Sequence, residues 1–145
     1  MVTSLSLLLW LSGCAHDGQA LRDDAHEREW LATSARLYWQ GLRWSDVDRA
    51  ANFIESDLDR AAFRAHLDDQ LQQQRVIDAT VLQVQISEDP ERTKGDPWRT
   101  GAVKVRVEGY TLPAQVVQID DIQQAWYRTP TGWWLTWSPP PLDAP

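Results

Sequence analysis

The chain of 145 residues has one cysteine and no concentrated run of lysine and arginine. A single Cys excludes an internal disulfide. The formal net charge is −7, which argues against nucleic acid as a partner, because phosphate contacts require clustered basic residues. The sequence also lacks a Gly-rich phosphate loop and the Gly-x-Ser-x-Gly motif, and no cysteine follows Cys14. The common signatures of nucleotide binding and of nucleophilic catalysis are therefore missing.

Long hydrophobic runs are missing too. A helix that spans a bilayer needs about 20 apolar residues. The N-terminal apolar run, residues 5–11, is short, and Asp17 follows soon after it. The run leads directly into Leu11-Ser12-Gly13-Cys14, so the only cysteine of the chain stands behind two small residues. This pattern is typical of a cleavage site after an apolar export signal.

The segment Leu11-Ser12-Gly13-Cys14 resembles the lipobox of bacterial lipoproteins. In that family a signal peptidase cuts before the cysteine, which is then acylated, so the resemblance implies lipidation of Cys14. Three acyl chains make such a tether permanent, whereas one chain holds only reversibly. No Lys or Arg precedes Arg22, so the usual basic n-region is absent. The alternative interpretation is a buried N-terminal helix or strand that happens to contain the cysteine.

The resemblance implies a cell-envelope location. Ala15, rather than Asp, follows Cys14, which resembles outer-membrane sorting with the domain facing the periplasm. The expected organisation is a signal peptide over residues 1–13 and a polar, flexible linker over residues 14–24. One domain over residues 25–138 and a Pro-rich tail over residues 139–145 complete it. The expected partners are the lipid bilayer, through acylated Cys14, and an envelope protein; the oligomeric state stays open.

Helical periodicity dominates the first half of the domain. It begins at Ala25 and continues to Gly41, with Trp30 and Tyr38 on one face. Ser45 is the expected N-cap of a second, short helix, and Ser56 or Asp57 opens a third. The side chains expected to face inward from these two helices are Val47, Ala50, Ala51, Ile54, Leu58, Ala61, Ala62, Ala65, Leu67 and Leu71.

From Ala79 the apolar period changes to two, which is typical of strands. One predicted strand covers residues 79–86, with Leu82, Val84 and Ile86 on one face, and a second carries Val103, Val105 and Val107. The segment 115–128 is long for one strand and changes phase at Asp120-Asp121, which predicts a bulge or bend. Residues 129–132 form a hairpin turn before the last strand. Segregated helices and about four antiparallel strands predict an α+β fold with helices on one face of a curved sheet.

Three segments resemble the NTF2-like (cystatin-like α+β) superfamily. They are Tyr38–Asp46, Val103–Tyr110, and Gln124–Arg128 together with Gly132–Leu135. The usual short strand between the second and third helices is not visible. The resemblance implies a cone, in which the sheet curls around a pocket and the helices close its other side. NTF2-like members include isomerases and dehydratases as well as non-catalytic binding modules, so the fold alone does not choose between these functions.

Nine tryptophans are the strongest compositional signal. Trp133 and Trp134 are adjacent on a strand, so they must point to opposite faces. One interpretation is an aromatic surface or pocket for an apolar ligand or a partner; the other is simple packing between a bent sheet and its helices. The candidate pocket or surface aromatics are Tyr38, Tyr110, Trp126 and Trp134.

No catalytic set emerges from the polar residues. Asp120 and Asp121 are consecutive on a strand, so their carboxylates diverge unless a bulge re-aims one of them. His16, His26 and His66 have no metal-ligand spacing, and neither a metal nor a cofactor is expected. The leading hypothesis is therefore a non-catalytic, membrane-anchored binding or assembly module for a protein partner or a small apolar ligand. The alternative is a periplasmic NTF2-like enzyme, which requires an open cone with a buried Asp or His facing a Tyr or Trp.

Overall fold

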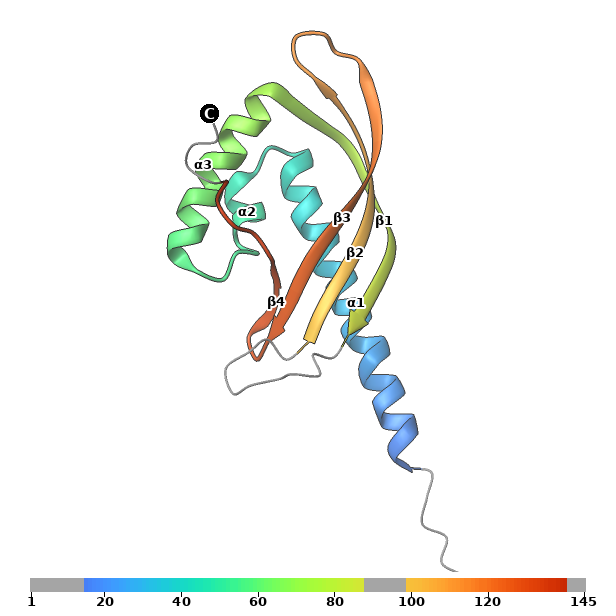
Figure 1. Cartoon of the computed structure of the whole chain (residues 1–145). Helices are drawn as coiled ribbons and strands as arrows, with labels where there is room; N and C mark the ends of the chain where they lie inside the picture. Colours follow the sequence, from blue (N-terminus) through green and yellow to red (C-terminus); the bar gives the residue numbers. More distant parts are fainter. Residues whose placement is uncertain (1–14, 88–98, 141–145) are drawn as a thin grey trace, which may run out of the picture.

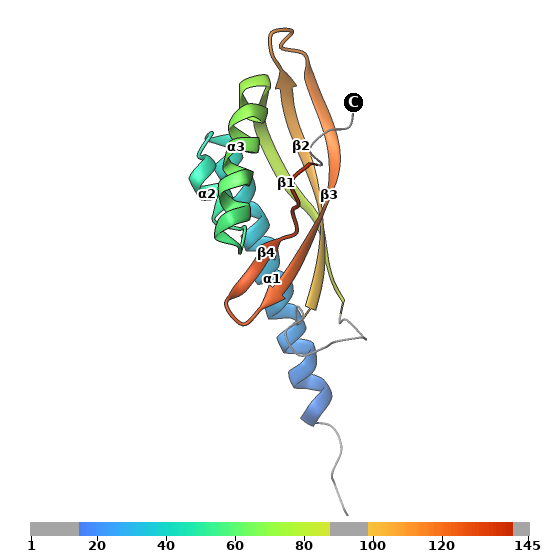
Figure 2. The same ribbon diagram turned by 60° about the vertical axis from the view of Figure 1, so that its left-hand side comes forward.

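The computed structural model describes residues 15–87 and 99–140. Its elements in chain order are α1 (Ala15–Arg43), α2 (Val47–Ala51), α3 (Asp57–Gln73), β1 (Gln74–Ser87), β2 (Arg99–Thr111), β3 (Val117–Thr129) and β4 (Gly132–Leu135). The strands form one antiparallel sheet in the order β1-β2-β3-β4. Figure 1 shows the sheet curving, and Figure 2 shows the helices gathered on one of its faces. The predicted α+β class, with helices packed on a four-stranded antiparallel sheet, is confirmed; the lipobox and Cys14 lie outside the described residues.

The first helix is longer than the sequence predicted. Helical backbone begins at Ala15 rather than Ala25, so residues 15–24 are helical and not a flexible linker. This part of α1 projects beyond the end of the sheet (Figure 1). The polar composition of the segment led to the prediction of a linker, but polar residues extend an established helix at little cost, because only its nucleation is expensive. Asp24 also ties the helix to the sheet through an ion pair of 2.7 Å with Arg99.

Side-chain caps define the starts of α2 and α3. The predicted cap Ser45 is wrong: Asp46 is the N-cap of α2, and its carboxylate accepts a hydrogen bond of 3.0 Å from the Arg49 N–H. Ser45 instead has a positive φ of 55°, in the tight turn that follows α1. Ser56, one of the two residues predicted to open α3, is its N-cap, and its hydroxyl accepts from the Asp59 N–H. Both caps satisfy backbone donors that lack a partner inside the helix.

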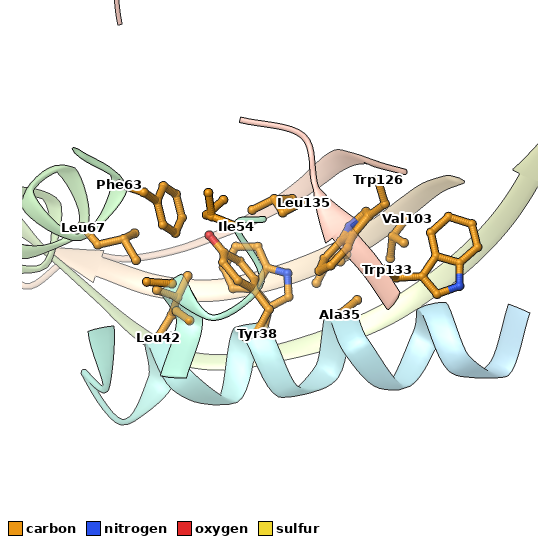
Figure 3. Packing of buried hydrophobic residues seen from close by; sticks show 14 of the residues in the cluster. Ala35, Tyr38, Leu42, Ile54, Phe63, Leu67, Val103, Trp126, Trp133 and Leu135 are labelled. Atoms are coloured by element: carbon orange, nitrogen blue, oxygen red, sulfur yellow. The ribbon is translucent and has the colours of Figure 1, made fainter. Parts of the chain in front are cut away.

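The core lies between α1, α2, α3 and the inner face of the sheet (Figure 3). Leu31, Ala35, Tyr38 and Leu42 of α1 are buried against it. On α3 the buried positions are Phe63, Leu67 and Leu71, each four residues apart, and so on one helix face.

The predicted inner face of α3 is therefore wrong in part. Leu58 is 81% exposed, and Ala61, Ala62 and Ala65 are exposed as well. The observed orientation of α3, with Phe63 facing inward, buries more apolar area than an orientation that buries the alanines, and it is therefore favoured.

The edge strand β1 contains two register shifts against β2. They lie between Val76 and Asp78 and between Val81 and Gln83, so Ile77 and Leu82 are the additional residues. A bulge changes the alternation of side chains along a strand. Leu82, predicted to share a face with Val84 and Ile86, is consequently 43% exposed, while Val81, Val84 and Ile86 pack against the core. The alternation predicted for β2 is confirmed, since Val103, Val105 and Val107 are all buried.

The sequence predicted a bulge or bend at Asp120-Asp121, and the strand has no bulge there. The register between β2 and β3 runs without a shift from Arg99 opposite Arg128 to Tyr110 opposite Val117. The irregularity of the sheet is instead concentrated in β1. At the other end of β3, the predicted hairpin turn leads into β4, where Trp133 and Leu135 are buried as one face of the alternation.

Candidate functional site

A pocket of about 300 Å³ opens at the end of the sheet that is nearest the C-terminal turns of α1 and α3. Residues from the start of β1, the end of β2 and the first half of β3 form its other walls. Its apolar lining consists of Leu42, Leu71, Val76, Val107 and Ile122. The volume lies at the lower end of the range for sites that bind small molecules.

The alternation of β3 decides which of its residues face this pocket. Gln118, Asp120, Ile122 and Gln124, at every second position, all line it. Trp126, two residues further on, continues the same face into the core and is 1% exposed. The inner face of β3 therefore changes from core to pocket at Gln124.

Gln124 is held in one orientation by Trp39. The Trp39 indole Nε1–H donates a buried hydrogen bond of 3.0 Å to Gln124 Oε1. An indole N–H can only donate, so the amide oxygen must be the atom that faces Trp39. The described residues give Gln124 Nε2 no hydrogen-bond partner. A side chain that is 9% exposed thus contributes two unused donor hydrogens to the pocket lining.

The two adjacent aspartates diverge, as the sequence predicted for consecutive strand residues. Asp120 lines the pocket, is exposed, and has no hydrogen bond or ion pair with any described residue. Asp121 lies on the outer face of the sheet, where it accepts bonds of 2.9 and 3.2 Å from the Arg106 guanidinium and lies 3.3 Å from Lys104 Nζ. The hydrogen bond from Arg106 is the main reason that the pKa of Asp121 is lowered.

Tyr38 stands between the pocket and the core. Its ring lies edge-on to Trp39, with centroids 5.5 Å apart, and edge-on to Trp126, with centroids 6.2 Å apart. Figure 3 shows Tyr38 rising from α1 toward the sheet. Burial raises the pKa of Tyr38 well above its ordinary value, so the phenol stays neutral and cannot serve as a base near neutral pH.

The structure brings together two of the four aromatic residues singled out in the sequence. Tyr38 and Tyr110 both line the pocket. Trp126 is a core residue, and its Nε1 has no hydrogen-bond partner among the described residues. Trp134 is half-buried at the β3–β4 hairpin, where its Nε1 donates to Thr129 Oγ1 at 2.8 Å. Neither of the two tryptophans singled out in the sequence therefore lines the pocket.

Sequence reasoning did not identify Trp39 and Gln124 as site residues. A signal for Gln124 was present, because Gln124 shares a strand face with Trp126 and is preceded on that face by Ile122 and Asp120. A polar residue at such a position needs a buried partner. The partner, Trp39, is far away in sequence, so only the packed structure shows the pair.

The described residues that line the pocket include no His, Lys, Cys or Ser, and Asp120 is the only carboxylate among them. His26 and His66 are exposed and lie beside Trp30 and Trp137, outside the pocket. Within residues 15–87 and 99–140, no cluster of His, Cys, Asp and Glu could hold a metal ion. A base placed against a nucleophile, which acyl transfer or hydrolysis requires, is not found in this pocket.

No helix in the described part of the chain is both long and apolar enough to cross a membrane. Comparison of the chain with protein families, with curated proteins and with solved structures finds no match.

Proposed function

We propose that this protein is a non-catalytic envelope lipoprotein, anchored through Cys14. Its domain binds a small ligand in the pocket between the sheet and the C-terminal turns of α1 and α3. One observation carries the binding role: Gln124 presents unused amide donors to a pocket whose lining also contains Tyr38, Trp39 and Ile122. A buried polar group without a partner costs free energy, so it is retained at little cost only where water or a ligand satisfies it. A few oriented polar groups on an apolar wall are the usual composition of a small-molecule site.

The enzyme alternative has less support. It requires a buried Asp or His that faces a Tyr or Trp inside an open cone. Asp120 shares the pocket with Tyr38 and Tyr110 but is exposed, and no histidine lines the pocket. A general base is normally held by a hydrogen-bond partner in a buried site, whereas Asp120 is exposed and has no partner among the described residues. Binding without chemistry is the simpler function for this lining.

The geometry of α1 is compatible with an anchored module. Ala15, the residue after Cys14, begins the helix, and Trp39 of the same helix lines the pocket. At 1.5 Å per residue, the helix separates these two positions by about 36 Å. Near its middle, α1 is fixed to the sheet because Glu27 accepts hydrogen bonds from Arg128 and Trp133. An anchored protein of this form takes its ligand from the aqueous side rather than from the bilayer core.

Replacing Cys14 tests the anchor. We expect the full-length chain, expressed in a bacterium with its N-terminal segment, to incorporate labelled palmitate and to sediment with membranes. The Cys14→Ala variant should lose both properties while its domain keeps the same unfolding temperature. A Cys14→Ala protein that is still acylated or still sediments with membranes would contradict the proposed anchor.

A pair of substitutions on β3 tests the pocket. Ile122→Trp should fill it, because Ile122 is part of the lining. Ile119→Trp is the matched control, since Ile119 lies on the same strand, faces the other side of the sheet and is 63% exposed. Binding of four probes (toluene, N-benzylacetamide, phenylacetate and benzylammonium) is followed by NMR titration. We expect Ile122→Trp to abolish binding and Ile119→Trp to preserve it; equal binding by both variants would contradict the proposed site.

A further inference from the structure

We infer that the pocket selects small uncharged molecules that carry a carbonyl oxygen, and that Gln124 is the residue that recognises this oxygen. The inference rests on the proposed function, and it adds the ligand class and the residue that determines specificity. Three structural features support it: the fixed amide of Gln124, the arrangement of charges along the pocket, and the apolar surface beside the amide.

Because the Gln124 amide is fixed, the site offers a ligand hydrogen-bond donors rather than an acceptor. A glutamine on a free surface can turn its amide to suit either kind of ligand group. Here the Trp39 Nε1–H occupies Gln124 Oε1 at 3.0 Å, and turning the amide would set two donors against each other. The Nε2 hydrogens therefore face any ligand that displaces water from this wall. A ligand oxygen restores their hydrogen bond, whereas a purely apolar ligand leaves them unpaired.

The sheet register excludes a cationic partner near Gln124. Among the described residues of the lining, the one cation is Arg75, which is opposite Tyr110 of β2; Tyr110 in turn is opposite Val117 of β3. Val117 and Gln124 are separated by seven residues, or about 23 Å at 3.3 Å per residue. Arg75 thus belongs to the other end of the pocket, and the Arg75 Nη1–H also donates to the Gln74 carbonyl.

The one carboxylate on this strand face disfavours an anionic ligand. Asp120 is four positions from Gln124 and has no cation beside it in the described structure. An anion bound at Gln124 would be desolvated without a compensating charge and would approach Asp120. An uncharged carbonyl has neither cost.

Apolar and aromatic side chains line the same pocket as the amide. Tyr38, Trp39 and Leu42 come from α1, and Val107 comes from β2. Ile122 separates Gln124 from Asp120 along the inner face of β3. The ligand class is therefore a carbonyl group attached to a small apolar body, such as an amide, an ester or a ketone.

The four probes named above, which share a benzyl or tolyl body, separate these possibilities. In the unaltered protein N-benzylacetamide should bind about tenfold more tightly than toluene or phenylacetate, as expected for one additional hydrogen bond in a partly buried site. Gln124→Glu is the decisive variant, because the glutamate can still accept from Trp39 but offers a ligand a carboxylate oxygen instead of N–H donors. Its affinity for N-benzylacetamide should fall about tenfold, its affinity for benzylammonium should rise, and its affinity for toluene should change less than twofold.

Gln124→Leu, which removes donor and acceptor together, provides the second test. This variant should bind N-benzylacetamide and toluene with equal affinity. Thermal unfolding of each variant checks that the fold persists. Toluene and N-benzylacetamide binding equally to the unaltered protein, or both unaffected by Gln124→Glu, would overturn the inference and leave the binding function standing. Absence of binding by all four probes would overturn the binding function as well.

Discussion

Trp39 of α1 and Gln124 of β3 are 85 positions apart in the chain and share a buried hydrogen bond of 3.0 Å. The bond joins the first helix to the centre of the sheet, at the boundary between the core and the pocket. The same contact therefore has two consequences: it satisfies two polar groups in an apolar interior, and it sets the orientation of the amide that faces the pocket.

Trp39→Phe should lower the free energy of unfolding by roughly 1–3 kcal/mol, because it leaves Gln124 Oε1 without its donor and removes buried ring area. Chemical denaturation measures the change. Trp44→Phe is the matched control, since Trp44 is 69% exposed, and it should change stability by less than about 0.5 kcal/mol. Equal effects of the two substitutions would contradict a structural role for the Trp39–Gln124 bond.

Glu27→Ala should destabilise the protein by about 2 kcal/mol or more. Glu27 accepts from Arg128 Nε at 2.9 Å and from Trp133 Nε1 at 3.1 Å, and the Arg128 side chain is 12% exposed. Without the carboxylate, a mostly buried guanidinium loses its counter-charge, which costs far more than loss of a surface pair.

Glu29→Ala is the control for Glu27→Ala on the same helix. Glu29 pairs with Arg36 at the surface, where both side chains are more than half exposed. Exposed pairs contribute about 0–1 kcal/mol, so this variant should unfold close to the unaltered protein. Similar losses in the two variants would show that Glu27 does not fix α1 to the sheet.

Gly109→Ala should be strongly destabilising, by roughly 2 kcal/mol or more, as expected for a forced steric overlap in a packed strand pair. A Cβ at Gly109 would lie 2.5 Å from the backbone carbonyl oxygen of Arg75, which cannot move without disturbing the pairing of β1 with β2. Gly132→Ala is the control, because a Cβ there meets nothing within 4 Å. The unfolding temperatures of the two variants test this prediction. A Gly109→Ala protein as stable as Gly132→Ala would contradict the close approach of β1 and β2.

Tyr127 should ionise at unusually high pH. Burial, followed by the hydrogen bond of 2.9 Å from its hydroxyl to Glu55, raises the pKa of Tyr127 to about 12. The folded protein therefore keeps a proton that the unfolded chain releases near pH 10, so this contribution to stability is lost between about pH 10 and pH 12.

A phenolate absorbance titration measures this ionisation, with Tyr127→Phe identifying the transition. Glu55→Gln should move the midpoint to lower pH, because the negative charge that disfavours the phenolate is gone. A midpoint that does not move would mean that Glu55 does not contribute to the raised pKa.

The sequence predicted the fold class because its two periodicities are carried by large apolar residues. Val103, Val105 and Val107 alternate with charged residues, and Trp133 and Leu135 share one strand face, so packing and pattern agree. The bulges at Ile77 and Leu82 were not predicted, since both residues are apolar and the shift depends on how β1 pairs with β2. Local patterns do not contain that information.

The candidate site was predicted less completely than the fold. Tyr38 and Tyr110 were singled out as aromatic candidates, and both line the pocket. The tryptophan signal drew attention to Trp126, which is a core residue, because a large side chain on an inner strand face suits either place. Gln124 became visible only when the packing brought Trp39 to it.

The central claim, that the wall formed by Trp39 and Gln124 is a ligand site, is tested most directly by NMR mapping with N-benzylacetamide. We expect the largest shifts at the Gln124 side-chain amide and the Trp39 indole N–H, with smaller shifts at Ile122. Amides on the outer face of the sheet, such as Ile119 and Asp121, should not respond. Shifts confined to that outer face, or no shift at Gln124 at saturating probe, would contradict the account.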